Sequence, residues 1–165
     1  MAGHGAPDLK VPAHGLNVAV IAGSWHREVT EAMTADALAA VAAAGATAQL
    51  FHVAGSFEIP LAAQTALASG YDAAVCLGVI VRGETPHFDY VCNAVTDGLT
   101  RVQLDAGKPV GFGVLTVDND EQAFDRSGLP GSREAKGREA AEAALHLVAA
   151  NRAIRASAQN TNTEA

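Results

Sequence analysis

Residues 79–90, which read VIVRGETPHFDY, place polar and titratable side chains where a run of β-branched residues breaks off at Gly83. Thr85 is a good N-cap residue and Pro86 suits the first helical position, so the pattern predicts a strand that turns into a helix. The backbone amides of such a turn favour an anion, above all phosphate. The alternative is an ordinary strand-to-helix turn, because Gly83-Glu84-Thr85 is no Walker loop and no lysine follows it.

His87 lies at the start of the helix that this turn introduces. Apolar residues recur at helical spacing further along, and His87 lies one turn before the first of them, Val91, so we expect His87 to face the sheet. An imidazole there can take up a proton and return it near neutral pH. The alternative is a histidine that only hydrogen-bonds a turn carbonyl.

Basic side chains gather before and into the last predicted helix: Arg126, Arg133, Lys136 and Arg138. A guanidinium among them can clamp a phosphate through two parallel hydrogen bonds, and Arg126 stands out because it precedes a loop. The alternative for each of them is a solvated surface, since Asp125, Glu134 and Glu139 lie among them.

Two aromatic residues and a carboxylate are candidates for binding a flat heteroaromatic ligand. Trp25 follows the first predicted strand, Phe112 lies between two glycines, and Glu58 lies in the first turn of a predicted helix. An indole can stack on such a ring, and a carboxylate can accept hydrogen bonds from its N–H groups. The alternatives are core packing for Trp25, a strand bulge at Phe112 and an interaction of Glu58 with the helix dipole.

Strands and helices alternate along the chain and must position these residues. The apolar pattern predicts strands at 17–22, 47–53, 73–81 and 110–117, and helices at about 28–44, 57–69, 86–106, 121–125 and 132–151. Ser56 is expected to cap the second helix. The alternation predicts an α/β fold with right-handed crossovers and a doubly wound sheet, whose ligands bind beyond the carboxyl ends of the strands.

Length and composition indicate one domain. We expect a flexible arm over residues 1–15, an α/β domain over 16–152 and a polar, frayed tail over 153–165. The hydrophobic content of 49% suits a buried sheet with further burial between subunits, so a homo-oligomer is expected. The net charge of -7 argues against nucleic acid and anionic membranes as partners.

Several classes of protein and site lack their usual patterns. No stretch has the length of a membrane span or the apolar core of a signal peptide, so we expect the cytoplasm. Cys76, Cys92 and the histidines show no metal-site spacing, so no metal is expected. The absence of GxSxG and GxGxxG motifs disfavours hydrolases and dinucleotide-dependent dehydrogenases.

Four motifs follow in order over roughly residues 16–150: SWH at 24–26, VAGSFEIP at 53–60, GVIVRGETPHFDY at 78–90, and GVLT at 113–116 followed by EQA at 121–123. Together they resemble the lumazine synthase family. The resemblance implies a flavodoxin-like three-layer α/β/α sandwich with a four-stranded, mainly parallel sheet. It also implies a homopentamer with active sites between adjacent subunits, and in many members twelve pentamers close into an icosahedral shell.

The activity that the resemblance implies is the penultimate step of riboflavin synthesis. In that step 5-amino-6-(D-ribitylamino)uracil condenses with 3,4-dihydroxy-2-butanone 4-phosphate to give 6,7-dimethyl-8-ribityllumazine, phosphate and water, with no metal or redox cofactor. A non-catalytic flavin or lumazine carrier and a purely structural shell protein are the alternatives. A carrier would not need His87, Arg126 and Lys136, and a structural protein would not need a phosphate turn.

The resemblance also implies a role for each matched residue. His87 transfers protons, while Lys136 supports the site. The pocket for the uracil and ribityl groups is formed by Trp25, Ser56, Phe57, Glu58, Val79, Ile80 and Val81, with Phe112 from the neighbouring subunit. The phosphate is bound by Gly83, Glu84 and Thr85, with Arg126 from the neighbouring subunit. The chain departs from the family at Trp25, where Phe is frequent, and at Ala54, where Pro or Gly is common, which bears on ligand affinity.

Overall fold

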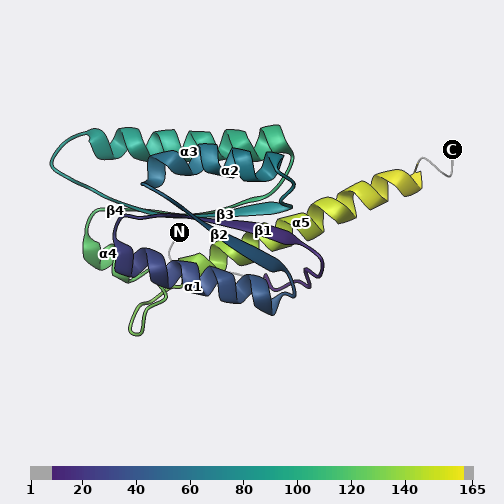
Figure 1. The fold of residues 1–165 in the computed structure, drawn as a ribbon, viewed down its shortest axis with the longest axis horizontal. Coiled ribbons are helices and arrows are strands. Elements are labelled where there is room, and N and C mark those ends of the chain that lie inside the picture. Colours follow the sequence, from purple (N-terminus) through teal and green to yellow (C-terminus); the bar gives the residue numbers. More distant parts are fainter. Residues whose placement is uncertain (1–8, 162–165) are drawn as a thin grey trace.

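The computed structural model describes residues 9–161, and Figure 1 shows its fold. The strands are β1 (Asn17–Gly23), β2 (Thr47–Val53), β3 (Ala73–Val81) and β4 (Val110–Val117). The helices are α1 (Arg27–Ala43), the short 3-10 helix η1 (Ser56–Glu58), α2 (Ile59–Ala68), α3 (His87–Ala106), α4 (Asp120–Phe124) and α5 (Lys136–Thr161). Each predicted strand is present within one residue of its expected limits.

The strands form one sheet in the order β2-β1-β3-β4, and every neighbouring pair is parallel. The central strand β1 is buried on both faces, because Val18 and Val20 point into one apolar cluster and Ala19 and Ile21 into the other. The parallel, doubly wound sheet predicted from the alternation of strands and helices is therefore confirmed.

Helices cover both faces of this sheet, which confirms the three-layer sandwich (Figure 1). α2 and α3 lie on one face, where Ile59 and Leu99 are fully buried, and α1 and α5 lie on the other, where Met33 and Leu145 are. Burying one such side chain is worth about 1.5–3 kcal/mol. The two cores therefore hold the sheet, and with it the loops at the strand ends.

The carboxyl ends of the strands are staggered, which matters for the site. β3 pairs with β1 only as far as Leu77, but its pairing with β4 continues to Val81. In the described chain, the backbone of residues 79–81 therefore has no strand partner on its β1 side. Backbone N–H and C=O groups along that side can bind a ligand instead.

The starts of α2 and α3 differ from the prediction in how they are capped. Ser56 does not cap the second helix; it begins η1, and Glu58 occupies the N-cap of α2. The Glu58 carboxylate accepts a hydrogen bond from the N–H of Gly55 (2.9 Å), the N-cap residue of η1. The side chain of Glu58, and not that of Ser56, therefore pairs with a backbone N–H at the start of this helical segment. At α3 the N-cap is Pro86, not Thr85, and no side chain caps the helix.

Both ends of the chain are more ordered than predicted where the structure describes them. α5 starts at Lys136, later than expected, and residues 153–161 continue it as helix, not as a frayed tail (Figure 1). Ala, Arg and Ile in this stretch favour helix, and neither Gly nor Pro interrupts it. In the expected arm, Ala13 is buried and its N–H donates to the carbonyl of Ala44 (2.7 Å); residues 1–8 and 162–165 lie outside the described residues. The domain limits stay a prediction.

Candidate active site

Trp25 follows β1 directly and is 69% exposed, which contradicts the alternative of core packing. Its indole lies against Gly55, where an added Cβ would stand 3.4 Å from the indole Nε1. The loop is fixed by two hydrogen bonds, since the Thr30 hydroxyl donates to the carbonyl of Trp25 (2.8 Å) and the Ser24 hydroxyl donates to the carbonyl of Val53 (2.7 Å). An anchored, exposed indole at the strand ends can stack on a planar ligand.

The segment after β2 brings Ser56, Phe57 and Glu58 beside this indole in three different environments. Ser56 is buried against β3, so closely that a Cβ on Gly78 would stand 2.5 Å from its hydroxyl oxygen. Phe57 is 64% exposed. Glu58 is also exposed, and beyond its bond to the Gly55 N–H its carboxylate has acceptor positions for the N–H groups of a ligand.

Val79, Ile80 and Val81 were expected to line the pyrimidine pocket. The structure buries the side chains of Val79 and Ile80 in the two cores, on opposite faces of the sheet, and half-buries that of Val81. The β1-facing edge of this segment is the part of β3 that has no strand partner. The segment therefore offers a ligand its backbone N–H and C=O groups.

The turn from Gly83 to Thr85 and the following His87 are exposed at the start of α3. The expectation that His87 faces the sheet was wrong, because Phe88 turns into the core instead and continues to the buried Val95. Phe88 lies two turns before Val95 on the buried stripe, whereas His87 lies one residue, about 100° around the helix, away from Phe88, so the imidazole is exposed. His87 is thus accessible to a substrate held at the end of β3.

A second group of candidates lies along the outer edge of β4. A cavity of about 630 Å³ there is lined by Phe112, Arg126 and Lys136, among others. Arg126 is anchored, because its Nη1 donates to a carbonyl of α4 (2.8 Å). The Lys136 ammonium lies 2.6 Å from the carboxylates of both Glu134 and Glu139. Burial works to lower the pKa of Lys136, but these two carboxylates together raise it above its ordinary value.

The structure thus separates the candidates of one subunit into two groups. The ring-binding and proton-transfer candidates lie at the carboxyl ends of β1, β2 and β3, whereas Arg126, Lys136 and Phe112 lie along β4. Arg133 and Arg138 do not line this edge; Arg133 pairs with Asp125, and Arg138 lies beside α1. The cavity lined by Arg126 includes no member of the first group. Within the described chain the two groups therefore do not meet.

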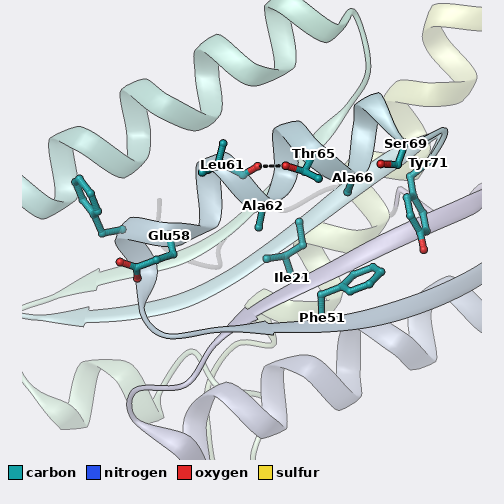
Figure 2. Close-up of a pocket in the computed structure, with 10 residues that line it drawn as sticks. Ile21, Phe51, Glu58, Leu61, Ala62, Thr65, Ala66, Ser69 and Tyr71 are labelled. Atoms are coloured by element: carbon teal, nitrogen blue, oxygen red, sulfur yellow. Dashed lines mark hydrogen bonds between the residues drawn. The ribbon is translucent and has the colours of Figure 1, made fainter.

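An apolar groove of about 630 Å³ adjoins the first group, and the sequence analysis missed it. Figure 2 shows it between α2 and β2, with Glu58 at one end, Tyr71 at the other and Phe51 below. Leu61 on α2 is 69% exposed at this groove. The available signal was that α2 is apolar on more than one face, which a helix covering only a sheet does not require.

Residues 9–161 contain neither a candidate metal site nor a candidate membrane span. No group of three or more His, Cys, Asp or Glu side chains there is arranged to hold a metal ion. None of the helices in that range is both long and apolar enough to cross a membrane. Cys76 and Cys92 are both free thiols, and burial raises the pKa of each.

Comparison with known proteins adds a family to this geometry. A family model described as 6,7-dimethyl-8-ribityllumazine synthase matches residues 15–152. A protein of that name from Leifsonia xyli is 54% identical over 157 residues, which covers 94% of this chain and 99% of the relative. One from Salinispora arenicola is 54% identical over 166 residues and covers 100% of both. One from Frankia casuarinae is 55% identical over 152 residues, or 90% of this chain and 94% of the relative.

Proposed function

Because the chain belongs to the 6,7-dimethyl-8-ribityllumazine synthase family, we propose that it condenses 5-amino-6-(D-ribitylamino)uracil with 3,4-dihydroxy-2-butanone 4-phosphate. The products are 6,7-dimethyl-8-ribityllumazine, phosphate and water, and the reaction is the penultimate step of riboflavin synthesis. The observation that carries the proposal is the pair of complementary half-sites: an exposed indole with hydrogen-bonding groups at the strand ends, and a basic edge along β4.

The first half-site suits the pyrimidine. Trp25 stacks on its ring, and Glu58 accepts hydrogen bonds from its N–H groups. The unpaired backbone edge of residues 79–81 supplies further donors and acceptors, and Ser56 closes the floor against β3. This half alone would serve a non-catalytic carrier equally well.

The phosphate and the proton carrier distinguish an enzyme from that carrier. The exposed amides of residues 83–85 bind the phosphate, and Arg126 of the adjacent subunit, with Lys136 in support, balances its charge. His87 moves protons during imine formation, phosphate loss and ring closure. These steps need two substrates held close together and a positioned proton carrier, so the reaction requires no metal or redox cofactor.

The proposed assembly is a homopentamer in which the first half-site of one subunit meets the β4 edge of the next. The exposed apolar side chains support it, since Phe57 and Leu61 lie at the first half-site, and Phe112 and Phe124 lie on β4 and α4. Such surfaces are typical of interfaces. A native mass measurement would give five subunits for a free pentamer and twelve times that mass for an icosahedral shell; a monomer would contradict the shared site.

A cytoplasmic location completes the proposal. Its support is that Cys76 and Cys92 are free thiols, as is usual in a reducing compartment. Fractionation of the source cells, followed by detection of the chain, would test it.

The test of the activity is to mix the purified protein with both substrates and follow lumazine fluorescence. An enzyme produces the fluorescent compound in many turnovers per site. A carrier binds added lumazine but forms none, and a structural protein does neither. Turnover that requires both substrates and releases one phosphate per lumazine would confirm the proposed reaction.

A further inference from the structure

We propose that Arg82 is a positioning residue that holds the phosphate-binding turn in its binding shape. The inference rests on the proposed function of that turn. Arg82 directly follows β3 and precedes Gly83, and none of the roles considered so far involves it.

Arg82 connects three elements. Its Nε donates to Oδ1 of Asp118, after β4 (2.9 Å), and its Nη1 donates to Oδ1 of Asp89, in the first turn of α3 (3.3 Å). Its guanidinium carbon lies 4.1 Å from the centre of the Phe88 ring. Its backbone N–H donates to the carbonyl of Val117 (2.9 Å), which extends the pairing of β3 with β4.

These contacts close the turn at its base. Residues 83–87 form the turn between Arg82 and Phe88. The guanidinium of Arg82 stacks on the ring of Phe88, so the two ends of the turn are in contact. Since Phe88 is buried, the guanidinium rests on a fixed surface. The direction of the turn amides, and of the following His87, therefore depends on Arg82.

The charges around Arg82 argue against direct phosphate binding. Its guanidinium faces two carboxylates, Asp118 and Asp89, so the trio as a whole does not attract an anion. The hydrogen bond that Arg82 donates to Asp118 is the main reason that the pKa of Arg82 lies above its ordinary value; burial opposes the rise, and Asp89 adds to it. The one cation of the trio is thus already engaged with two carboxylates.

The deciding variant is Asp118→Asn. If charge alone mattered, removing a negative charge near the turn would tighten the binding of a phosphorylated substrate. If Arg82 positions the turn, Asp118→Asn and Arg82→Met should both lower kcat/KM for the phosphorylated butanone, by on the order of tenfold to a hundredfold. The KM for the pyrimidine should stay unchanged, and the double variant should be no worse than Arg82→Met alone, because both changes remove one interaction.

Two further variants are informative. Arg82→Lys keeps the charge but loses the planar fork, so it should restore little of the activity. The matched control is the exposed pair of Arg101 and Asp105 on α3 (3.1 Å), where Arg101→Met and Asp105→Asn should leave both kinetic constants unchanged. Thermal unfolding checks that every variant folds.

Hydrogen exchange tests the inference without turnover. The amides of residues 83–87 should exchange faster in Arg82→Met and Asp118→Asn than in the unmodified chain, and at the same rate in the α3 controls. Unchanged exchange would overturn the inference, as would tighter binding of the phosphorylated substrate by Asp118→Asn. A loss confined to Arg82→Met would instead make Arg82 a phosphate ligand. If the unmodified chain forms no lumazine, the proposed function fails, and the exchange data still decide the role of Arg82.

Discussion

His87 was expected to face the sheet but is exposed, and its proposed role as a proton carrier holds in either position. It is exposed at the start of α3, beside the turn amides, where a proton carrier can reach a substrate. His87→Ala should lower kcat by roughly a hundredfold, at the lower end of what a positioned proton carrier contributes. The KM for the pyrimidine should hardly change, because Trp25 and Glu58 are intact. Steady-state kinetics would check this, and an unaltered kcat would remove His87 from the mechanism.

The role proposed for Arg126, charge balance at the phosphate, can be tested separately. Its guanidinium is held by a carbonyl of α4 and lines the β4 cavity. Arg126→Ala should raise the KM for the phosphorylated butanone by roughly tenfold to a hundredfold, as expected when a charged hydrogen bond worth about 1.5–3 kcal/mol is lost. The same assay with the pyrimidine varied is the control, and an equal rise in both constants would argue against a phosphate role.

At this scale the sequence predicted residue types better than environments. The motifs identified Trp25 and Arg126 as candidates, and in the structure the Trp25 indole is exposed and the Arg126 guanidinium is anchored on α4. The spacing did not settle the environment of His87, because His87 lies one turn before Val91 while its neighbour Phe88 lies two turns before Val95, and the structure buries Phe88. Arg82 was missed because its partner Asp118 lies 36 residues away, a distance over which sequence gives no pairing signal.

At the scale of elements, β3 and η1 pack too closely at Gly78 to accommodate a side chain there. A Cβ at Gly78 would stand 2.5 Å from the Ser56 hydroxyl oxygen and 3.0 Å from Cδ1 of Ile59. Gly78→Ala should therefore lower the free energy of unfolding by about 1–3 kcal/mol, the usual range for overpacking. Urea denaturation measures this value.

The control and the rescue for that change use the same contact. Gly83→Ala adds the same methyl group where nothing lies within 4 Å, so its free energy of unfolding should change little. Adding Ser56→Gly to Gly78→Ala removes the closest atom and should restore part of the loss. If Gly78→Ala and Gly83→Ala had the same free energy of unfolding, close packing between β3 and η1 would not explain the glycine at position 78.

Elements were the most predictable part of this chain, and their ends the least. The parallel sheet could be predicted because a strand buried on both faces is a nearly continuous apolar run, as β3 is. Helix ends depend on single hydrogen bonds, such as that from Gly55 to Glu58, which no periodicity reports. The tail of α5 was misread because its polarity suggested disorder while its residues favour helix.

For the whole molecule, the groove between α2 and β2 bears on assembly. Leu61 is 69% exposed there, so Leu61→Glu should leave the fold of the subunit unchanged. In the proposed pentamer the new carboxylate would be buried without a partner, so the assembly should dissociate to smaller species. Native mass measurement checks this. Ala35→Glu, which adds the same charge at an exposed position of α1 on the opposite layer, should leave the mass unchanged.

The proposed sharing of the site between subunits also predicts that two inactive variants can restore each other's activity. His87→Ala removes the proton carrier from the first half-site, and Arg126→Ala removes the guanidinium from the β4 edge, so each variant alone has a defect at every interface. In oligomers assembled from an equal mixture, roughly a quarter of the interfaces join an intact His87 to an intact Arg126 from the next subunit. Activity should rise towards that fraction after the two variants are unfolded and reassembled together, and should stay low when they are mixed as preformed oligomers. If joint reassembly gave no gain, His87 and Arg126 would have to act within the same subunit. Because Arg126 lies at the β4 edge, in a cavity that contains no residue of the first half-site, that result would contradict the proposed mechanism.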